Sequence, residues 1–78
     1  MNYVATFYTQ AAALLTNRTL KSRGIVCKAG PVPRELSSSC GTCVHYTADS
    51  PMTDALDPDI ESVYEITPTG YRLLLHHD

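Results

Sequence analysis

The sequence lacks any hydrophobic run long enough to cross a bilayer. Its longest apolar stretches are Ala11 to Leu15 and Leu73 to Leu75, far short of the roughly 20 residues that a spanning helix needs. The first residues, Met-Asn-Tyr-Val, have neither the basic start nor the apolar stretch of a signal peptide. These absences predict a cytoplasmic protein that does not enter a membrane.

Basic residues are also few, with six Lys and Arg against eight Asp and Glu and no basic run. Neutralising phosphates needs clustered cations, so we expect neither a nucleic acid nor an anionic membrane surface as a partner.

The hydrophobic fraction of 44% and charged fraction of 18% are those of a globular protein. With 78 residues the chain predicts one domain, residues 1–78, with little room for a deep cleft. Chemistry is therefore expected in a surface loop or in partnership with another protein.

Only three cysteines are present, Cys27, Cys40 and Cys43. An odd number makes a poor disulfide framework, and the cytosol keeps such thiols reduced. The glycines form no phosphate-binding motif, and the serines form no nucleophile elbow. Cys40 and Cys43 are therefore the candidates for chemistry. Cys27 shares a face of its expected strand with Ile25 and is expected to pack in the core.

The pattern of apolar and turn-forming residues predicts four strands and two helices. Strands are expected at residues 3–8, 25–29, 43–47 and 62–67, and helices at 10–23 and 51–56, with 71–75 extending or returning the last strand. Thr9 is a suitable cap for the first helix, whose inward stripe is expected to contain Leu15. Ser50-Pro51 indicates the start of the second helix. This order predicts an α+β, ferredoxin-like split β-α-β fold (βαββαβ), an antiparallel sheet with two helices on one face.

The segment between the second and third strands carries the chemistry. Pro31 and Pro33 stop the strand, and Ser37, Ser38 and Ser39 precede Cys40-Gly41. Cysteine reacts as its thiolate, which hydroxyl and backbone N–H donors and a nearby cation stabilise. The residues that could do so are the three serines, Gly41 and Arg34. On composition alone, a polar surface loop with an incidental cysteine is an equal alternative.

Residues 31–41, Pro-Val-Pro-Arg-Glu-Leu-Ser-Ser-Ser-Cys-Gly, resemble the central motif of the selenium/sulfur carrier-like family of short, mostly uncharacterised bacterial proteins. An opening strand like Tyr3-Val-Ala-Thr-Phe7 and the Gly24-Ile25 entry to the second strand agree with this resemblance. It implies a carrier, rather than a true enzyme, that holds a persulfide or selenosulfide on Cys40 and passes it on. It also implies a desulfurase-like donor, an acceptor protein, no cofactor, and an accessible Cys40 supported by Arg34, Ser37, Ser38, Ser39 and Gly41.

Other readings of the same residues stay open. Cys40 and Cys43 form a C-x-x-C pair, so Cys43 is either a resolving or redox thiol or a packed strand residue. Zinc ligation by both cysteines with His45, His76 or His77 lacks a second ligand pair, so no metal is expected.

The remaining alternative is a non-catalytic interaction domain in which the loop is only a recognition surface. An edge strand of so small a sheet offers a possible homodimer contact. Nothing in the residues separates sulfur from selenium, since both bind the same thiolate.

Overall fold

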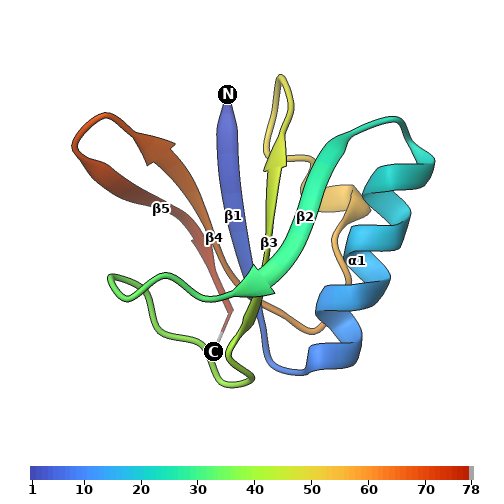
Figure 1. Cartoon of the computed structure of the whole chain (residues 1–78), viewed down its shortest axis with the longest axis horizontal. Helices are drawn as coiled ribbons and strands as arrows, with labels where there is room; N and C mark the ends of the chain where they lie inside the picture. The colour runs from blue at the N-terminus through green and yellow to red at the C-terminus, as the bar shows by residue number, and fades with distance from the viewer. Residues whose placement is uncertain (78) are drawn as a thin grey trace.

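One antiparallel sheet and one α-helix form the fold of residues 1–77, the part of the chain described by this computed structural model. In chain order the elements are β1 (Asn2–Phe7), α1 (Gln10–Ser22), β2 (Val26–Pro31), β3 (Thr42–Thr47), the 3-10 helix η1 (Thr53–Ala55), β4 (Ile60–Thr67) and β5 (Gly70–His76). Figure 1 shows α1 beside the β2 end of the sheet and β5 at the opposite end. The predicted α+β class is confirmed.

The strand order is β2-β3-β1-β4-β5, and every neighbouring pair is antiparallel. Strands β1 and β2 are therefore parallel to each other with β3 between them, and α1 connects them. This arrangement is the first half of the predicted split β-α-β unit. In the middle of the sheet Ala5 lies opposite Val44 on β3 and Val63 on β4.

The prediction of a second helix at residues 51–56 is wrong, because only the single 3-10 turn η1 (Thr53–Ala55) forms there. Met52 precedes it in the left-handed region, with φ of 53°, so Ser50-Pro51 does not begin a helix. Pro58 closes the segment a few residues later, and so short a stretch cannot offset the cost of helix nucleation. The ferredoxin-like βαββαβ fold with two helices is thus replaced by a one-helix sheet. Its fifth strand is β5, which returns from β4.

Helix α1 begins where the sequence predicts, since the Thr9 hydroxyl accepts a hydrogen bond of 3.1 Å from the Ala12 N–H. Its buried residues are Ala12, Ala13, Thr16 and Leu20. Leu15 was expected to face the core, but its side chain is 51% exposed. The small Ala13 lies inward instead, which allows the helix to approach the sheet closely.

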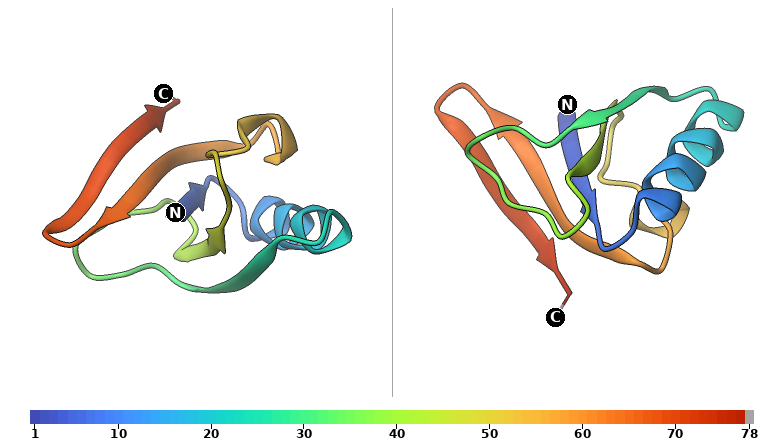
Figure 2. Two further views of the ribbon diagram at one scale, coloured as in Figure 1. Left: turned by 90° about the horizontal axis from the view of Figure 1, so that it is seen from above. Right: turned by 60° about the horizontal axis from the view of Figure 1, so that its bottom comes forward.

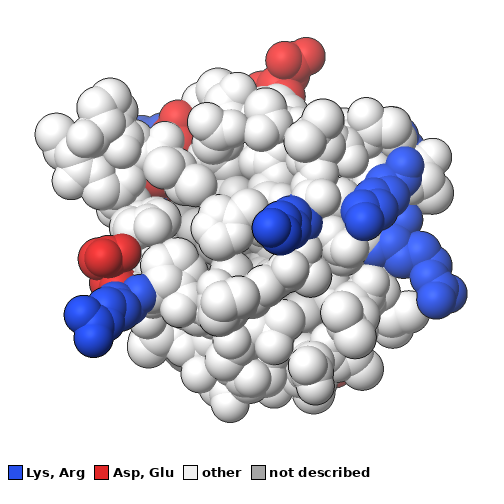
Figure 3. Space-filling model, in the orientation of Figure 1, with Lys and Arg blue, Asp and Glu red and all other residues white. Residues whose placement is uncertain are grey.

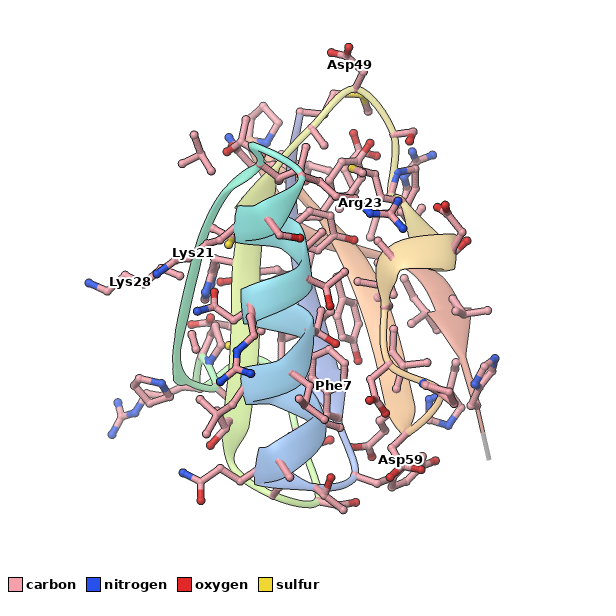
Figure 4. The ribbon with its side chains drawn as sticks, turned by 90° about the vertical axis from the view of Figure 1, so that its right-hand side faces the viewer. Phe7, Lys21, Arg23, Lys28, Asp49 and Asp59 are labelled. Atoms are coloured by element: carbon pink, nitrogen blue, oxygen red, sulfur yellow. The ribbon has the colours of Figure 1, made fainter. Side chains whose placement is uncertain are left out.

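The main core lies between α1 and one face of the sheet. Figure 4 shows this side of the molecule, with α1 in front of the strands and Phe7 beside its first turns. The buried aromatic residues of this layer are Tyr3, Phe7 and Tyr46, and the rings of Tyr3 and Tyr46 stack with centroids 5.3 Å apart. These contacts fix β3, which follows the loop between β2 and β3, and β1, which pairs with β3.

The opposite face of the sheet is buried over part of its area. Val4, Thr6 and Cys43 are all fully buried there although α1 covers the other side. Figure 2 shows the sheet strongly curved, with the loop between β2 and β3 extending to the β5 side, away from α1. This curvature and the loop bring polar side chains into the protein interior.

On the face shown in Figure 3, Lys and Arg lie mostly toward the α1 and β2 side, and the few Asp and Glu lie elsewhere. Arg23 at the end of α1 pairs with Asp54 of η1 at 3.3 Å. Among residues 1–77 no helix combines the length and apolar character needed to cross a membrane.

Candidate functional site

The motif residues lie in a long loop that connects β2 to β3 (Figures 1 and 2). The backbone N–H of Val32 donates to the carbonyl oxygen of Gly41 at 3.2 Å, which closes the base of the loop. A turn at its far end is closed by Leu36 N–H and Pro33 C=O at 3.0 Å. Gly41 adopts a φ of 74°, a left-handed conformation that disfavours residues with a Cβ. The loop therefore returns to β3 through a turn that this glycine allows.

Two serines attach the loop to strands far away in sequence. The Ser38 hydroxyl donates to the Phe7 carbonyl oxygen at 3.2 Å, at the end of β1. The backbone N–H and hydroxyl of Ser39 both reach the Glu61 carboxylate, at 3.0 and 3.4 Å. Charge-assisted hydrogen bonds of this kind are stronger than neutral ones. The residues on the amino-terminal side of Cys40 are thus held by both β1 and β4.

Cys40 lies partly exposed immediately after these anchors. Its backbone N–H donates to the Ser38 hydroxyl at 3.4 Å, and the same hydroxyl lies 3.9 Å from the sulfur. The Cys40 thiol itself points to the carbonyl oxygen of Thr42 at 3.4 Å. Of the predicted supports, Ser38 lies against the Cys40 sulfur, Ser39 binds Glu61 instead, and Gly41 provides the turn that follows Cys40.

Arg34 and Ser37 are placed differently. Both are exposed, and neither side chain makes a hydrogen bond or an ion pair with another of residues 1–77. Figure 3 shows a basic and an acidic side chain protruding together at the lower left, over this loop. The supporting roles assigned to Arg34 and Ser37 remain predictions, and their exposure suits contact with another molecule.

Cys43, at the start of β3, is fully buried. Its sulfur lies 3.4 Å from the Pro31 carbonyl oxygen and 3.7 Å from Nδ1 of His45. Burial, with a smaller contribution from the negative charge of Cys40, raises the pKa of the Cys43 thiol to about 11. Burial also lowers the pKa of the His45 imidazole below its usual value. At neutral pH this pair therefore consists of a thiol beside a neutral imidazole.

The third cysteine lies elsewhere. Cys27 on β2 is partly buried against the core, and its sulfur donates to the Asn17 carbonyl oxygen of α1 at 3.4 Å. Burial raises its pKa, which Lys21 partly opposes. This position agrees with the packing role predicted for Cys27.

Among residues 1–77 the cysteines and histidines do not form a zinc site. Within the described residues no group of three or more His, Cys, Asp or Glu side chains is arranged to hold a metal ion. His76 instead lies on β5, with Nδ1 2.7 Å from the hydroxyl of Ser62.

A cavity of about 320 Å³ opens beside β3. Its lining includes Asn2, Lys28, His45, Thr47 and Ile66, from four different strands. His45 is partly exposed and lies two residues from buried Cys43 on the same strand. The imidazole thus connects the buried thiol with a solvent-accessible space.

Sequence reasoning missed two residues of this site. Glu61 anchors Ser39 from β4, and Thr6 lies directly opposite Cys43 on β1. Strand pairing brings both to the loop, and no local pattern around either residue indicates this.

The family model for Putative Se/S carrier protein-like sequences matches residues 2–55. The chain belongs to this family. The match extends from β1 through η1 and includes the whole loop with Cys40 and Cys43, whereas β4 and β5 lie beyond it. Searches of curated proteins and of solved structures found no significant match.

Proposed function

We propose that this protein carries sulfur or selenium on Cys40, as a persulfide or selenosulfide, between a donor and an acceptor protein. The observation that carries the proposal is the position of Cys40 in a loop that belongs to the matched family region. Cys40 is partly exposed, although it packs against the edge of the core, whereas Cys43 is buried. Cys40 is thus the loop thiol that a second protein can reach.

The loading step is a transfer between sulfur atoms. The Cys40 thiolate attacks the terminal sulfur of a donor persulfide, the donor S–S bond breaks, and the donor leaves as its thiolate. With a donor selenosulfide the product is Cys40–S–SeH by the same displacement. A cysteine desulfurase is the class of donor proposed here, and the acceptor repeats the attack on the terminal atom.

The loop is suited to this role because its backbone is held on both sides of Cys40, by Ser38 and Ser39 before it and by the Val32–Gly41 hydrogen bond after it. Hydrogen bonds from Ser38 and Ser39 to β1 and β4 hold the backbone. Fixing a reacting group beforehand reduces the entropy lost when two proteins bring their sulfur atoms together. Arg34 and Ser37, which protrude without partners among residues 1–77, are proposed to contact the donor or the acceptor.

Incubation of the reduced protein with a cysteine desulfurase and cysteine, and separately with selenocysteine, tests the proposal. Intact mass and peptide mapping should find one added sulfur or selenium atom on Cys40. Cys40→Ser should show no adduct, and Cys27→Ser, the matched control, should load like the wild type. An adduct found only on Cys27, or no adduct on a chain whose Cys40 is free, would refute the carrier function and favour the interaction domain.

The homodimer suggested by the sequence would use an edge strand. The edge strand β5 carries the exposed side chains of Leu73 and Leu74 and is the strand proposed for such a contact. Sedimentation equilibrium of the wild type and of Leu73→Ser would detect it as a mass that falls in the variant.

A further inference from the structure

We propose that Cys43 discharges the loaded carrier. In this step His45 accepts the Cys43 proton, and the Thr6 hydroxyl donates a hydrogen bond to the Cys43 thiolate. This inference rests on the proposed carrier function and adds its release step. In that step Cys43 attacks the inner sulfur of the Cys40 persulfide. A Cys40–Cys43 disulfide forms, and the terminal atom leaves as hydrosulfide or hydroselenide.

The two thiols lie beside the same pair of residues. The Cys40 sulfur contacts the carbonyl oxygen of Thr42, and the Cys43 sulfur contacts that of Pro31, each at 3.4 Å. Pro31 and Thr42 are register partners across β2 and β3. Gly41, between the two cysteines, allows the chain to turn at this point. The two cysteines thus lie at the same end of the β2–β3 pair, and the attack requires the loop at Gly41 to bring the Cys40 sulfur toward Cys43.

A buried thiol must lose its proton before it can attack, since the thiolate is the nucleophile. Nδ1 of His45 lies 3.7 Å from the Cys43 sulfur, and in the tautomer with the proton on Nε2 it offers a lone pair. Burial lowers the pKa of this imidazole, so it is neutral at pH 7 and its Nδ1 lone pair is free for the Cys43 proton. His45 also lines the cavity of about 320 Å³, so the proton has a path to solvent.

The hydroxyl of Thr6 supplies an independent observation. Thr6 lies opposite Cys43 on β1 and is fully buried, yet its oxygen has no hydrogen-bond partner among residues 1–77. Unsatisfied buried hydroxyls are costly and therefore uncommon. Thr6 shares a sheet face with Cys43, so rotation of its hydroxyl toward the Cys43 thiolate would supply the partner that it lacks in the resting protein.

The electrons and atoms of the step balance without another reagent. Relative to the unloaded protein, two thiol sulfurs are oxidised to a disulfide, and the sulfane sulfur or selenium takes both electrons and leaves as hydrosulfide or hydroselenide. The Cys43 proton passes to His45 and then to solvent. Return to the reduced protein needs two electrons from a dithiol reductant.

The proposal is tested in chains that all carry Cys27→Ser, so that only Cys40 and Cys43 react. Cys40 is loaded with the desulfurase, the donor is removed, and hydrosulfide release and intact mass are followed. The parent chain should release its sulfur and form the disulfide, whereas Cys43→Ser and Cys43→Ala should stay loaded. Discharge of both variants at the parent rate would overturn the proposal.

His45→Gln and Thr6→Val test whether these two side chains assist the attack by Cys43. We expect His45→Gln to slow discharge near pH 7 by about 100-fold, and the deficit to shrink toward pH 11, where Cys43 ionises without a base. Other groups near His45 are Lys28 on β2 and, beyond Val4 on β1, Tyr64 on β4. Thr6→Val keeps the side-chain shape and should slow discharge by about 10-fold. Parent-like rates in both variants at every pH would refute their assigned roles.

A second substrate makes the result independent of sulfur carriage. An aromatic disulfide reagent places a coloured thiol on Cys40 as a mixed disulfide, and attack by Cys43 releases it. Successful release here with no loading by the desulfurase would mean that the carrier function is wrong but the Cys43 chemistry is right. Circular dichroism shows whether the labelled protein is folded. A mixed disulfide that persists in folded protein would overturn the inference.

Discussion

Gly41 combines a φ of 74° with open space around the position of a Cβ. Replacing it with alanine therefore introduces backbone strain without a steric clash. We expect Gly41→Ala to lower the free energy of unfolding by about 1 kcal/mol. Urea denaturation measures this change.

The matched control is Gly30→Ala, which also meets no atom within 4 Å but has no positive φ. Alanine there restricts the unfolded chain and should be neutral or slightly stabilising. An equal loss of stability in both variants would contradict the assignment of strain to Gly41.

Cys43 predicts a dependence of stability on alkaline pH. The thiol ionises near pH 9 when unfolded and near 11 when folded, so the unfolded chain loses its proton first. Stability is therefore complete below pH 9 and declines as pH rises to 11, by on the order of 1 kcal/mol per pH unit. Urea denaturation across this range checks the slope.

Cys43→Ser should flatten that slope. Tyr46, whose phenol pKa burial also raises, contributes equally in both proteins, so the difference isolates Cys43. Identical slopes would show that Cys43 is not buried as described.

At the scale of elements, the loop between β2 and β3 depends on β4 for its position. Glu61 binds both the backbone N–H and the hydroxyl of Ser39. We expect Glu61→Ala to cost about 1 kcal/mol and to speed amide exchange at Ser39 and Cys40. Hydrogen exchange followed by mass spectrometry measures the second effect.

Asp54→Asn provides the control for loss of a carboxylate. It breaks the exposed ion pair with Arg23, a contact of the kind worth less than about 1 kcal/mol. It should leave exchange in the loop unchanged. If Glu61→Ala also leaves it unchanged, the proposed anchor is wrong.

The whole molecule requires strands beyond the family match. Strand β4 pairs with β1 in the middle of the sheet, and its Ile60 and Val63 are buried in the core. A chain ending at Asp57 would expose the open edge of β1 and lose these side chains. We therefore predict that residues 1–57 show no cooperative unfolding by circular dichroism in urea, whereas the full chain with Leu73→Ser, an exposed site, unfolds cooperatively.

The local elements were largely predictable from residues close together in the chain. Thr9 and the following alanines specify the start of α1, and the alternation around Tyr3 and Val44 specifies strands. The second helix was not predictable in the same way. Ser50-Pro51 has the chemistry of a helix start, but Pro58 and the left-handed Met52 leave only one turn. Pairing of β4 with β1 and β5 then completes the sheet without that helix.

The sequence alone determined the Cys40 motif and its family, because both depend on contiguous residues. Only the tertiary structure distinguished the two thiols of the C-x-x-C pair. The folded sheet buries Cys43, whereas Cys40 lies in the loop and is partly exposed. It also brought Glu61 to Ser39, and His45 and Thr6 to Cys43. Those contacts depend on strand register across the sheet, which no local spacing in the chain encodes.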